Sequence, residues 1–202
     1  MPAYEWPQIV RALRSLHGLT CAQFAVMLAT TEETVTRWEA GAALPDPREQ
    51  ALLRDVLTGH FRHHPTFLGL KAMVRTMGEM TTLYTPGLIA QAVSPPLARW
   101  IEKHRFDIVG SSLLPRIDGM TAEMMERYAL PMLDGTGDLL SVTYNDRAVA
   151  FRNAVINRRL SVVPVDGVRV LVLVDRVLYR DDGQGMPDLD LRMLTADNLT
   201  DD

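Results

Sequence analysis

The sequence predicts a multidomain protein: an all-α domain over residues 1–59, then an α+β domain with an antiparallel sheet over residues 79–180. Three observations indicate this fold class. Four capped helical patterns occur before residue 60, and the hydrophobic period changes from helical spacing to alternation near Met80. Asp166-Gly167 separates two alternating runs, which is typical of a two-residue β-hairpin turn.

Start and stop signals define the four N-terminal helices. Helix caps and first-turn prolines place their beginnings at Pro7, Thr20, Thr31 and Asp46. Gly18 and Gly41 end the first and the third. Apolar residues at helical spacing, such as Val35 and Trp38 in the third helix, give each helix a buried side.

The remainder mixes strands and helices. Residues 60–78 are expected to form a linker and a connecting or dimerising helix from Pro65 to Met77. Strands are predicted over residues 80–84, 88–93, 139–144, 159–165 and 168–179, and helices over 96–103 and 121–133. Residues 181–202 carry one Arg against seven Asp, so we expect an acidic, disordered tail.

Composition excludes several classes of protein. A hydrophobic content of 47% with 23% charged residues is typical of a folded domain. The N-terminus lacks a signal-peptide pattern, and the strongest apolar run, residues 168–174, is too short to span a membrane. Cys21 is the single cysteine, which excludes a disulfide within the chain. We therefore expect a cytoplasmic protein without membrane contact.

The chain carries no pattern of an enzyme. A Walker loop, a zinc-protease helix and a nucleophile elbow are all absent from the sequence, so we expect no catalytic residues and no cofactor. His60, His63 and His64 cluster around Arg62 and admit either a metal site or a solvated, phosphate-facing linker. The absence of Cys or acidic ligands beside them favours the linker, and we expect no metal.

Charge is distributed unevenly along a chain of net charge −4. Residues 1–59 carry −2, residues 60–180 carry +4 and residues 181–202 carry −6. Attraction of the whole chain for a polyanion is therefore excluded, and any affinity for DNA must come from a few well-placed charges and from dimerisation.

The segments LTCAQFA (residues 19–25) and TEETVTRWEAG (residues 31–41), followed by Pro45, resemble the helix-turn-helix of Cro/CI-type (XRE family) regulators. The resemblance covers about residues 6–58, and the Trp-Glu-x-Gly-x-x-x-Pro ending is its most specific part. It implies a sequence-specific transcriptional regulator whose recognition helix, Thr31–Ala40, enters the major groove of double-stranded DNA. It also implies that Glu39 is held within the domain.

This resemblance and the helical spacing place eight residues at the DNA: Thr20, Cys21, Thr31, Glu32, Glu33, Thr34, Thr36 and Arg37. Arg37 can donate twice to guanine, and Glu33 can accept from cytosine. An alternative is that Glu32 and Glu33 only stabilise the N-terminal end of the helix. Cys21 likewise admits a structural role or a redox role.

Two departures from the family pattern weaken the expected binding to the phosphate backbone of DNA. The family often has Gln at the position of Cys21, where it meets a phosphate, and basic residues at the positions of Ala42 and Ala43. One copy should therefore hold DNA weakly, and we expect a homodimer on two half-sites.

Residues 77–179 resemble a PAS-like sensor domain through their order of two strands, short helices, a longer helix and three strands. Local cues are LYTPG (residues 83–87), VSP (residues 93–95) and VGSSLL (residues 109–114). The combination with the helix-turn-helix is similar to activators of gene transfer agent operons. The resemblance implies a domain for dimerisation, sensing or contact with RNA polymerase or another regulator.

Two functions remain open at this point. The first is a DNA-binding transcriptional regulator. The alternative is an antitoxin-like or adaptor protein whose C-terminal domain binds another protein, with DNA binding secondary. Operator affinity that appears only with a protein partner would distinguish the second from the first.

Overall fold

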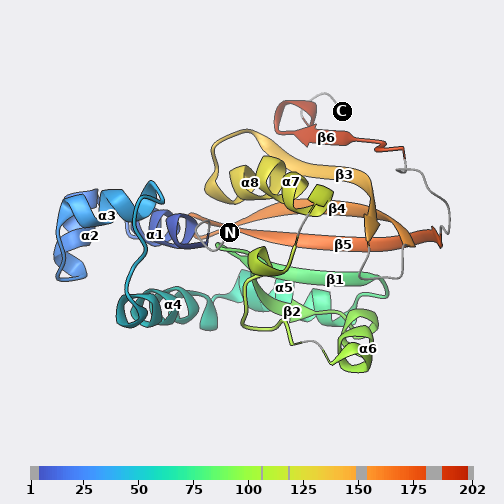
Figure 1. Ribbon diagram of the computed structural model, residues 1–202, viewed down its shortest axis with the longest axis horizontal. Helices are drawn as coiled ribbons and strands as arrows, with labels where there is room; N and C mark the ends of the chain where they lie inside the picture. Colours follow the sequence, from blue (N-terminus) through green and yellow to red (C-terminus); the bar gives the residue numbers. More distant parts are fainter. Residues whose placement is uncertain (1–4, 106, 118, 149–153, 181–187, 200–202) are drawn as a thin grey trace.

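A computed structural model describes residues 5–105, 107–117, 119–148, 154–180 and 188–199 of the 202-residue chain. The helices are α1 (Glu5–Leu16), α2 (Cys21–Met27), α3 (Glu32–Glu39), α4 (Pro47–Arg62), α5 (Pro65–Thr76), α6 (Pro95–His104), α7 (Gly119–Met124) and α8 (Leu130–Asp134). The strands are β1 (Met80–Thr85), β2 (Ile89–Val93), β3 (Leu139–Ala148), β4 (Ala154–Val165), β5 (Val168–Arg180) and β6 (Arg192–Thr195). The predicted order, a helical part followed by an α+β part with an antiparallel sheet, is confirmed (Figure 1).

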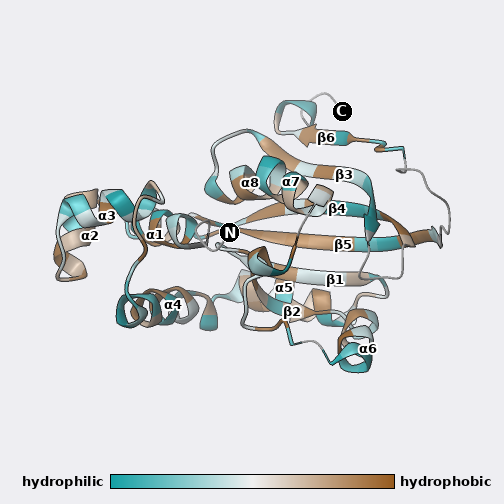
Figure 2. Ribbon diagram, viewed as in Figure 1, coloured by the Kyte–Doolittle hydropathy of each residue, from teal (hydrophilic) through white to brown (hydrophobic). Residues whose placement is uncertain are grey.

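The sheet has the strand order β2-β1-β5-β4-β3-β6, and every neighbouring pair is antiparallel. Its central hairpin, β4–β5, turns through Asp166 and Gly167, whose φ angles of 51° and 81° are the left-handed values that a tight two-residue turn requires. This confirms the predicted hairpin. The apolar run of β5 lies in the middle of the sheet, as its brown colour in Figure 2 shows.

Alternating residues of the strands build a hydrophobic layer on each face of the sheet. On one face, Tyr84, Leu160 and Leu171 belong to a cluster with residues of the helical segment that contains α7 and α8. On the other, Leu83, Val172 and Val174 belong to a cluster with Phe67 and Val74 of α5. The sheet therefore lies between two helical layers, α5 on one face and the segment with α7 and α8 on the other.

The helical segment that covers the first face is continuous from residue 119 to residue 134 and includes a π-helical turn, Met125–Ala129, between α7 and α8. Pro131 explains the turn, because it has no N–H with which to bond the Arg127 carbonyl. At its N-terminal end, Thr121 Oγ1 donates to Asp146 Oδ2 at 2.7 Å. The helix predicted over residues 121–133 is confirmed.

An ionic cluster lies in the interior beside Thr121. Arg158 is 6% exposed and donates to both carboxylate oxygens of Asp175, at 2.8 and 3.3 Å, and to Asp146 at 3.1 Å. Buried charges of this kind are tolerated only when they are paired, as these are. The cluster fixes β3, β4 and β5 to one another and to the start of α7.

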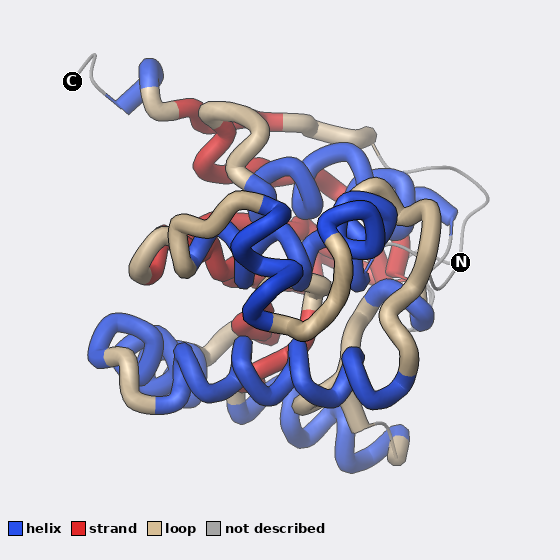
Figure 3. The backbone as a smooth tube through the Cα atoms, turned by 90° about the vertical axis from the view of Figure 1, so that its left-hand side faces the viewer, coloured by secondary structure: helices blue, strands red, loops and turns tan. Residues whose placement is uncertain are grey.

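The N-terminal helices share their hydrophobic core with the sheet. Buried residues of α1 and α3, including Ile9 and Trp38, belong to the same cluster as Val172 and Val174 of β5. Viewed from the side of the N-terminal helices, Figure 3 shows them in front of the strands. The two predicted parts are therefore in direct contact.

Polar side chains of α1 complete this contact. Gln8 is 2% exposed; its Oε1 accepts from the backbone N–H of Gly87 at 3.1 Å, and its Nε2 donates to the Leu130 carbonyl at 3.3 Å. Arg11 Nη2 donates to Asp134 Oδ2 at 2.7 Å, at the end of α8. Helix α1 thus holds both the β1–β2 turn and α8.

Two elements differ from the sequence-based expectation. Helix α4 continues through Gly59 and His60 to Arg62, where a linker was expected, because Phe61 extends the buried stripe of Leu53 and Leu57. The disordered tail is corrected for residues 188–199, because β6 lies there and pairs with β3. The other tail residues, 181–187 and 200–202, lie outside the described residues. No helix in the described part of the chain is long and apolar enough to cross a membrane.

Candidate nucleic-acid interface

The first feature of the candidate interface is the attachment of α3 to the rest of the helical part. Val35 and Trp38 are 0% and 2% exposed, and they fix one side of the helix to the N-terminal core. Thr31 caps its N-terminal end by accepting from the Thr34 N–H at 3.2 Å. The spacing of three between the buried residues leaves the opposite side of α3 to solvent.

Most of the residues assigned to DNA contact lie on this outward side. Four residues of α3 are exposed: Glu32, Glu33, Thr36 and Arg37. Thr31 is also exposed, whereas Thr34 is half-buried and its hydroxyl lies 2.8 Å from that of Thr31. Thr34 therefore serves the cap, and the other five present their side chains to solvent.

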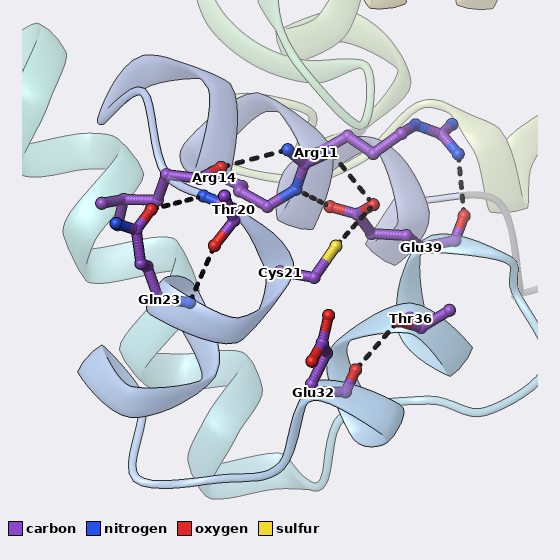
Figure 4. Close-up of polar contacts among 9 residues, drawn as sticks. Arg11, Arg14, Thr20, Cys21, Gln23, Glu32, Thr36 and Glu39 are labelled. Atoms are coloured by element: carbon purple, nitrogen blue, oxygen red, sulfur yellow. Dashed lines mark hydrogen bonds and ion pairs between the residues drawn. The ribbon is translucent and has the colours of Figure 1, made fainter.

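Helix α2 brings the remaining two predicted residues beside α3. Thr20 and Gln23 form the predicted capping box, with Gln23 N–H donating to Thr20 Oγ1 at 3.2 Å and Thr20 N–H donating to Gln23 Oε1 at 2.8 Å. The exposed Thr20 lies at the N-terminal end of α2, while Cys21 is half-buried with its Sγ 3.9 Å from Glu39 Oε2 (Figure 4). The thiol thus faces the interior ion pair of the helical part.

Glu39 anchors this arrangement. Its carboxylate accepts from Arg14 Nε at 2.6 Å and from Arg14 Nη2 at 3.2 Å, and its backbone carbonyl accepts from Arg11 Nη1 at 2.7 Å (Figure 4). The hydrogen bond to Glu39 is the largest cause that raises the pKa of Arg14. Arg14 also donates to the Leu19 carbonyl at 3.1 Å. One arginine of α1 therefore holds the start of α2 and the end of α3 together.

Arg11 and Arg14 were not among the residues predicted from the sequence. Both lie on α1 at a spacing of three, which places them on one side of the helix. That spacing was the available signal, but nothing in it identifies Glu39 and Asp134 as their partners. Both arginines act by positioning the helices, since their guanidinium groups bond to other parts of the chain.

The position and charge of the α2–α3 pair determine what it can contact. The pair projects at one end of the long axis, away from the sheet (left in Figure 1). On the outward side of α3, Arg37 is the one cation beside two carboxylates, Glu32 and Glu33. This surface offers hydrogen-bonding groups for base edges and little charge for phosphates.

The histidines of the predicted linker lie elsewhere. His60 belongs to α4, His63 follows it, and His64 precedes the first turn of α5. His64 Nε2 lies 3.6 Å from Asp166 Oδ2 at the tip of the β4–β5 hairpin. His64 therefore contacts the sheet at the junction of α4 and α5, away from the α2–α3 surface.

In comparisons with known proteins, no family model matches the chain, and no curated protein matches it.

Proposed function

We propose that this protein is a sequence-specific DNA-binding transcriptional regulator, and that α3 reads base edges in the major groove. The observation that carries the proposal is the outward side of α3: Glu32, Glu33, Thr36 and Arg37 are exposed while Val35 and Trp38 are buried. These exposed side chains can donate to and accept from bases, and they lie on a helix that projects from the molecule.

The α+β part supports a PAS-like sensing domain. Two strands, short helices, the longer helical segment and three strands occur in the order on which the resemblance rests. The contacts of α1 with the β1–β2 turn and with α8 connect this part to the DNA-reading helices. We propose that a signal received by the sheet part alters the presentation of α3.

The function is tested by selecting duplexes from a randomised pool with the full-length chain. We expect one enriched motif, bound more tightly than a scrambled duplex at the same salt concentration. Salt must be fixed because phosphate contacts alone produce sequence-independent binding. Equal affinity for the enriched and scrambled duplexes would exclude a sequence-reading regulator.

We further propose that two copies bind together. The first 59 residues carry a net charge of −2, so one copy gains little from phosphate attraction. Pairing between β1 and β5 ends at Asp175, and beyond it Val177, Leu178 and Tyr179 of β5 are 46–55% exposed. An exposed strand edge with apolar side chains favours pairing with a second chain. The same edge favours the alternative function, an adaptor that binds another protein.

The dimer predicts two half-sites whose centres lie about 34 Å apart or a multiple of that distance. Leu178→Arg should give a monomer in sedimentation velocity and weaken binding to the full operator, while binding to a single half-site stays the same. Arg159→Ala, exposed on β4 between β3 and β5 and therefore away from this edge, is the control. A monomeric wild-type chain that occupies one half-site at full affinity would contradict the dimer.

A further inference from the structure

Residues 188–196 lie along the outer edge of β3 and complete the sheet there (red, beside β3 in Figure 1). At one end of the contact, the backbone N–H of Asn145 donates to the Leu189 carbonyl at 2.8 Å. At the other end, the Ala196 N–H donates to the Asp138 carbonyl at 3.1 Å. Between these two bonds β6 pairs with β3, so one short segment covers most of the outer edge of the strand.

Backbone hydrogen bonds, more than side chains, hold this segment in place. None of residues 188–196 is buried, and three of the four residues of β6 are exposed. Arg192 donates to Asp190 within the segment, at 3.0 and 3.1 Å, and this pair does not attach the segment to β3. Within residues 188–196, Leu191 is the side chain that packs against a hydrophobic cluster of the core. The segment is therefore a weakly anchored strand.

Strand β3 does not depend on β6 for its place in the sheet. Its other edge pairs with β4 over residues 141–148. Val142 and Tyr144 are both 0% exposed within the core, and Asp146 belongs to the buried ionic cluster. Removal of β6 would thus leave β3 in position, with a row of unpaired backbone N–H and C=O groups. Such an edge is a template for pairing with another extended chain.

The segment also shows which side chains the edge accepts. Because successive residues of a strand point to opposite faces, alternate residues share one face. Met193 pairs with the buried Val142 and therefore lies on the same face as Leu191, beside the helical segment with α7 and α8. Leu194 lies on the opposite face and pairs with Ser141. Apolar side chains are thus favoured at alternate positions on the α7–α8 side.

We propose that the outer edge of β3 binds an extended segment of a protein partner with apolar residues at alternate positions, and that residues 188–196 cover the edge until this segment displaces them. The main-chain hydrogen bonds of an added strand give affinity, and contacts of its alternate side chains give specificity. The same segment of a second copy would bring identical contacts against a competitor that is already tethered, so exchange between copies is disfavoured. A foreign segment with a larger apolar side chain at the place of Leu191 gains contact with the core and can compete.

The first test measures binding of a fluorescein-labelled peptide to the full-length chain; the peptide copies residues 188–196, DLDLRMLTA. Fluorescence anisotropy should show weak binding to the wild type, because only the small fraction of molecules with an open edge can bind. Leu191→Asp should bind the peptide about 10-fold more tightly, because its own segment loses its contact with the core and leaves the edge open more often. Leu194→Asp, the same change on the opposite face, is the matched control and should bind as the wild type does.

A disulfide provides the second test. Thr143 and Arg192 are directly paired across β3 and β6, so cysteines at both positions can form a bridge that locks the edge. The Thr143→Cys/Arg192→Cys chain also carries Cys21→Ser, which removes the single native cysteine. Its oxidised form should bind no peptide, and reduction should restore binding. A peptide with Asp at the position of Leu191 should bind neither form.

The proposal is overturned by any of three results: peptide binding to Leu191→Asp that is no tighter than to the wild type, binding that the disulfide leaves unchanged, or equal binding of the two peptides. Sedimentation velocity of Leu191→Asp separates a partner segment from exchange between copies. Assemblies larger than those of the wild type would assign the edge to a second copy instead. None of these measurements involves DNA, so their outcome is independent of the proposed function.

Discussion

Six of the eight residues of α3 are either buried or exposed, and Thr34 and Glu39 are half-buried. Val35 and Trp38 are buried and the four residues around them face solvent, as the helical spacing predicted. The partner of Glu39 was beyond prediction, because Arg14 lies 25 residues earlier and an ion pair leaves no periodic pattern in a sequence. Thr34 was predicted to contact DNA, yet its side chain is half-buried and its hydroxyl bonds to that of Thr31, the capping residue. A capping threonine accepts from the backbone N–H three residues later, which places Thr34 beside it.

Arg37→Ala should weaken binding to the selected operator by about 1–3 kcal/mol and relax preference at one base pair, because a bidentate contact to guanine is lost. Fluorescence anisotropy on duplexes that differ at single positions measures both effects. Arg159→Ala, exposed on β4 in the middle of the sheet, is the matched control. An equal loss of affinity on every sequence would mean that Arg37 contacts phosphate.

Glu39→Gln should lower the free energy of unfolding by about 1–3 kcal/mol, because it removes the charge that pairs with a partly buried guanidinium. Urea unfolding of the full-length chain measures the change. Glu33→Gln, exposed on the same helix, should stay within about 0.5 kcal/mol of the wild type. The expectation is overturned when the two variants are equally stable.

At the scale of elements, hydrophobic spacing located most helices and strands but did not locate their ends. Strand β4 begins at Ala154 rather than near Arg159, because pairing with β3 and β5 extends it into a less regular segment. Strand β6 was missed for a related reason: four residues within the acidic tail, RMLT, become a strand by pairing with the edge strand β3, which is a tertiary effect. Gly59 indicated a helix end, yet the burial of Phe61 carries α4 past it.

The stability contributed by the junction between α4 and α5 should depend on pH. Burial is the largest cause that lowers the pKa of His60 below its usual 6.5; His64 and His17 add to this, and Asp166 opposes it. Because the folded state then binds the proton less readily than the unfolded state, His60 contributes stability above about pH 6.5 that is lost as the pH falls. Tm should therefore fall between pH 7.5 and 5.5.

His60→Gln should make this fall smaller, because the titrating group is gone. His63→Gln, exposed at the same corner, should leave the fall unchanged. Differential scanning calorimetry at several pH values measures both. If Tm falls by the same amount in His60→Gln as in the wild type, the pH dependence comes from other groups.

For the whole molecule, the sequence predicted the order and class of the two parts but not the way in which they join. Gln8, Arg11 and the apolar residues of α1 bond or pack against segments about 80 to 160 residues away. Periodicity reports which side of a helix is buried and says nothing about what covers it. The boundary after residue 59 therefore divides a hydrophobic core that runs from α1 to β5.

Full-length protein should unfold in one cooperative transition, since the core is shared. Residues 65–202 alone should lose cooperativity and bind the dye ANS, because removal of α1 and α4 exposes apolar surface and leaves the Gly87 N–H without its Gln8 partner. Calorimetry and dye fluorescence measure both properties. A sharp transition for residues 65–202, without dye binding, would show instead that the sheet part folds independently.

The helical segment from residue 119 to residue 134 is attached to the rest of the molecule by a side-chain contact near each end. Thr121 donates to Asp146 inside the sheet part, and Asp134 accepts from Arg11 on α1, which shares a hydrophobic core with α3. A displacement of α1 must then be accommodated by deformation of this helical segment. The π-helical turn is its most compliant section, because Pro131 has removed one of the regular hydrogen bonds there. A movement of α2 and α3 relative to the sheet part is thus expected to reach Tyr128, a core residue on that turn.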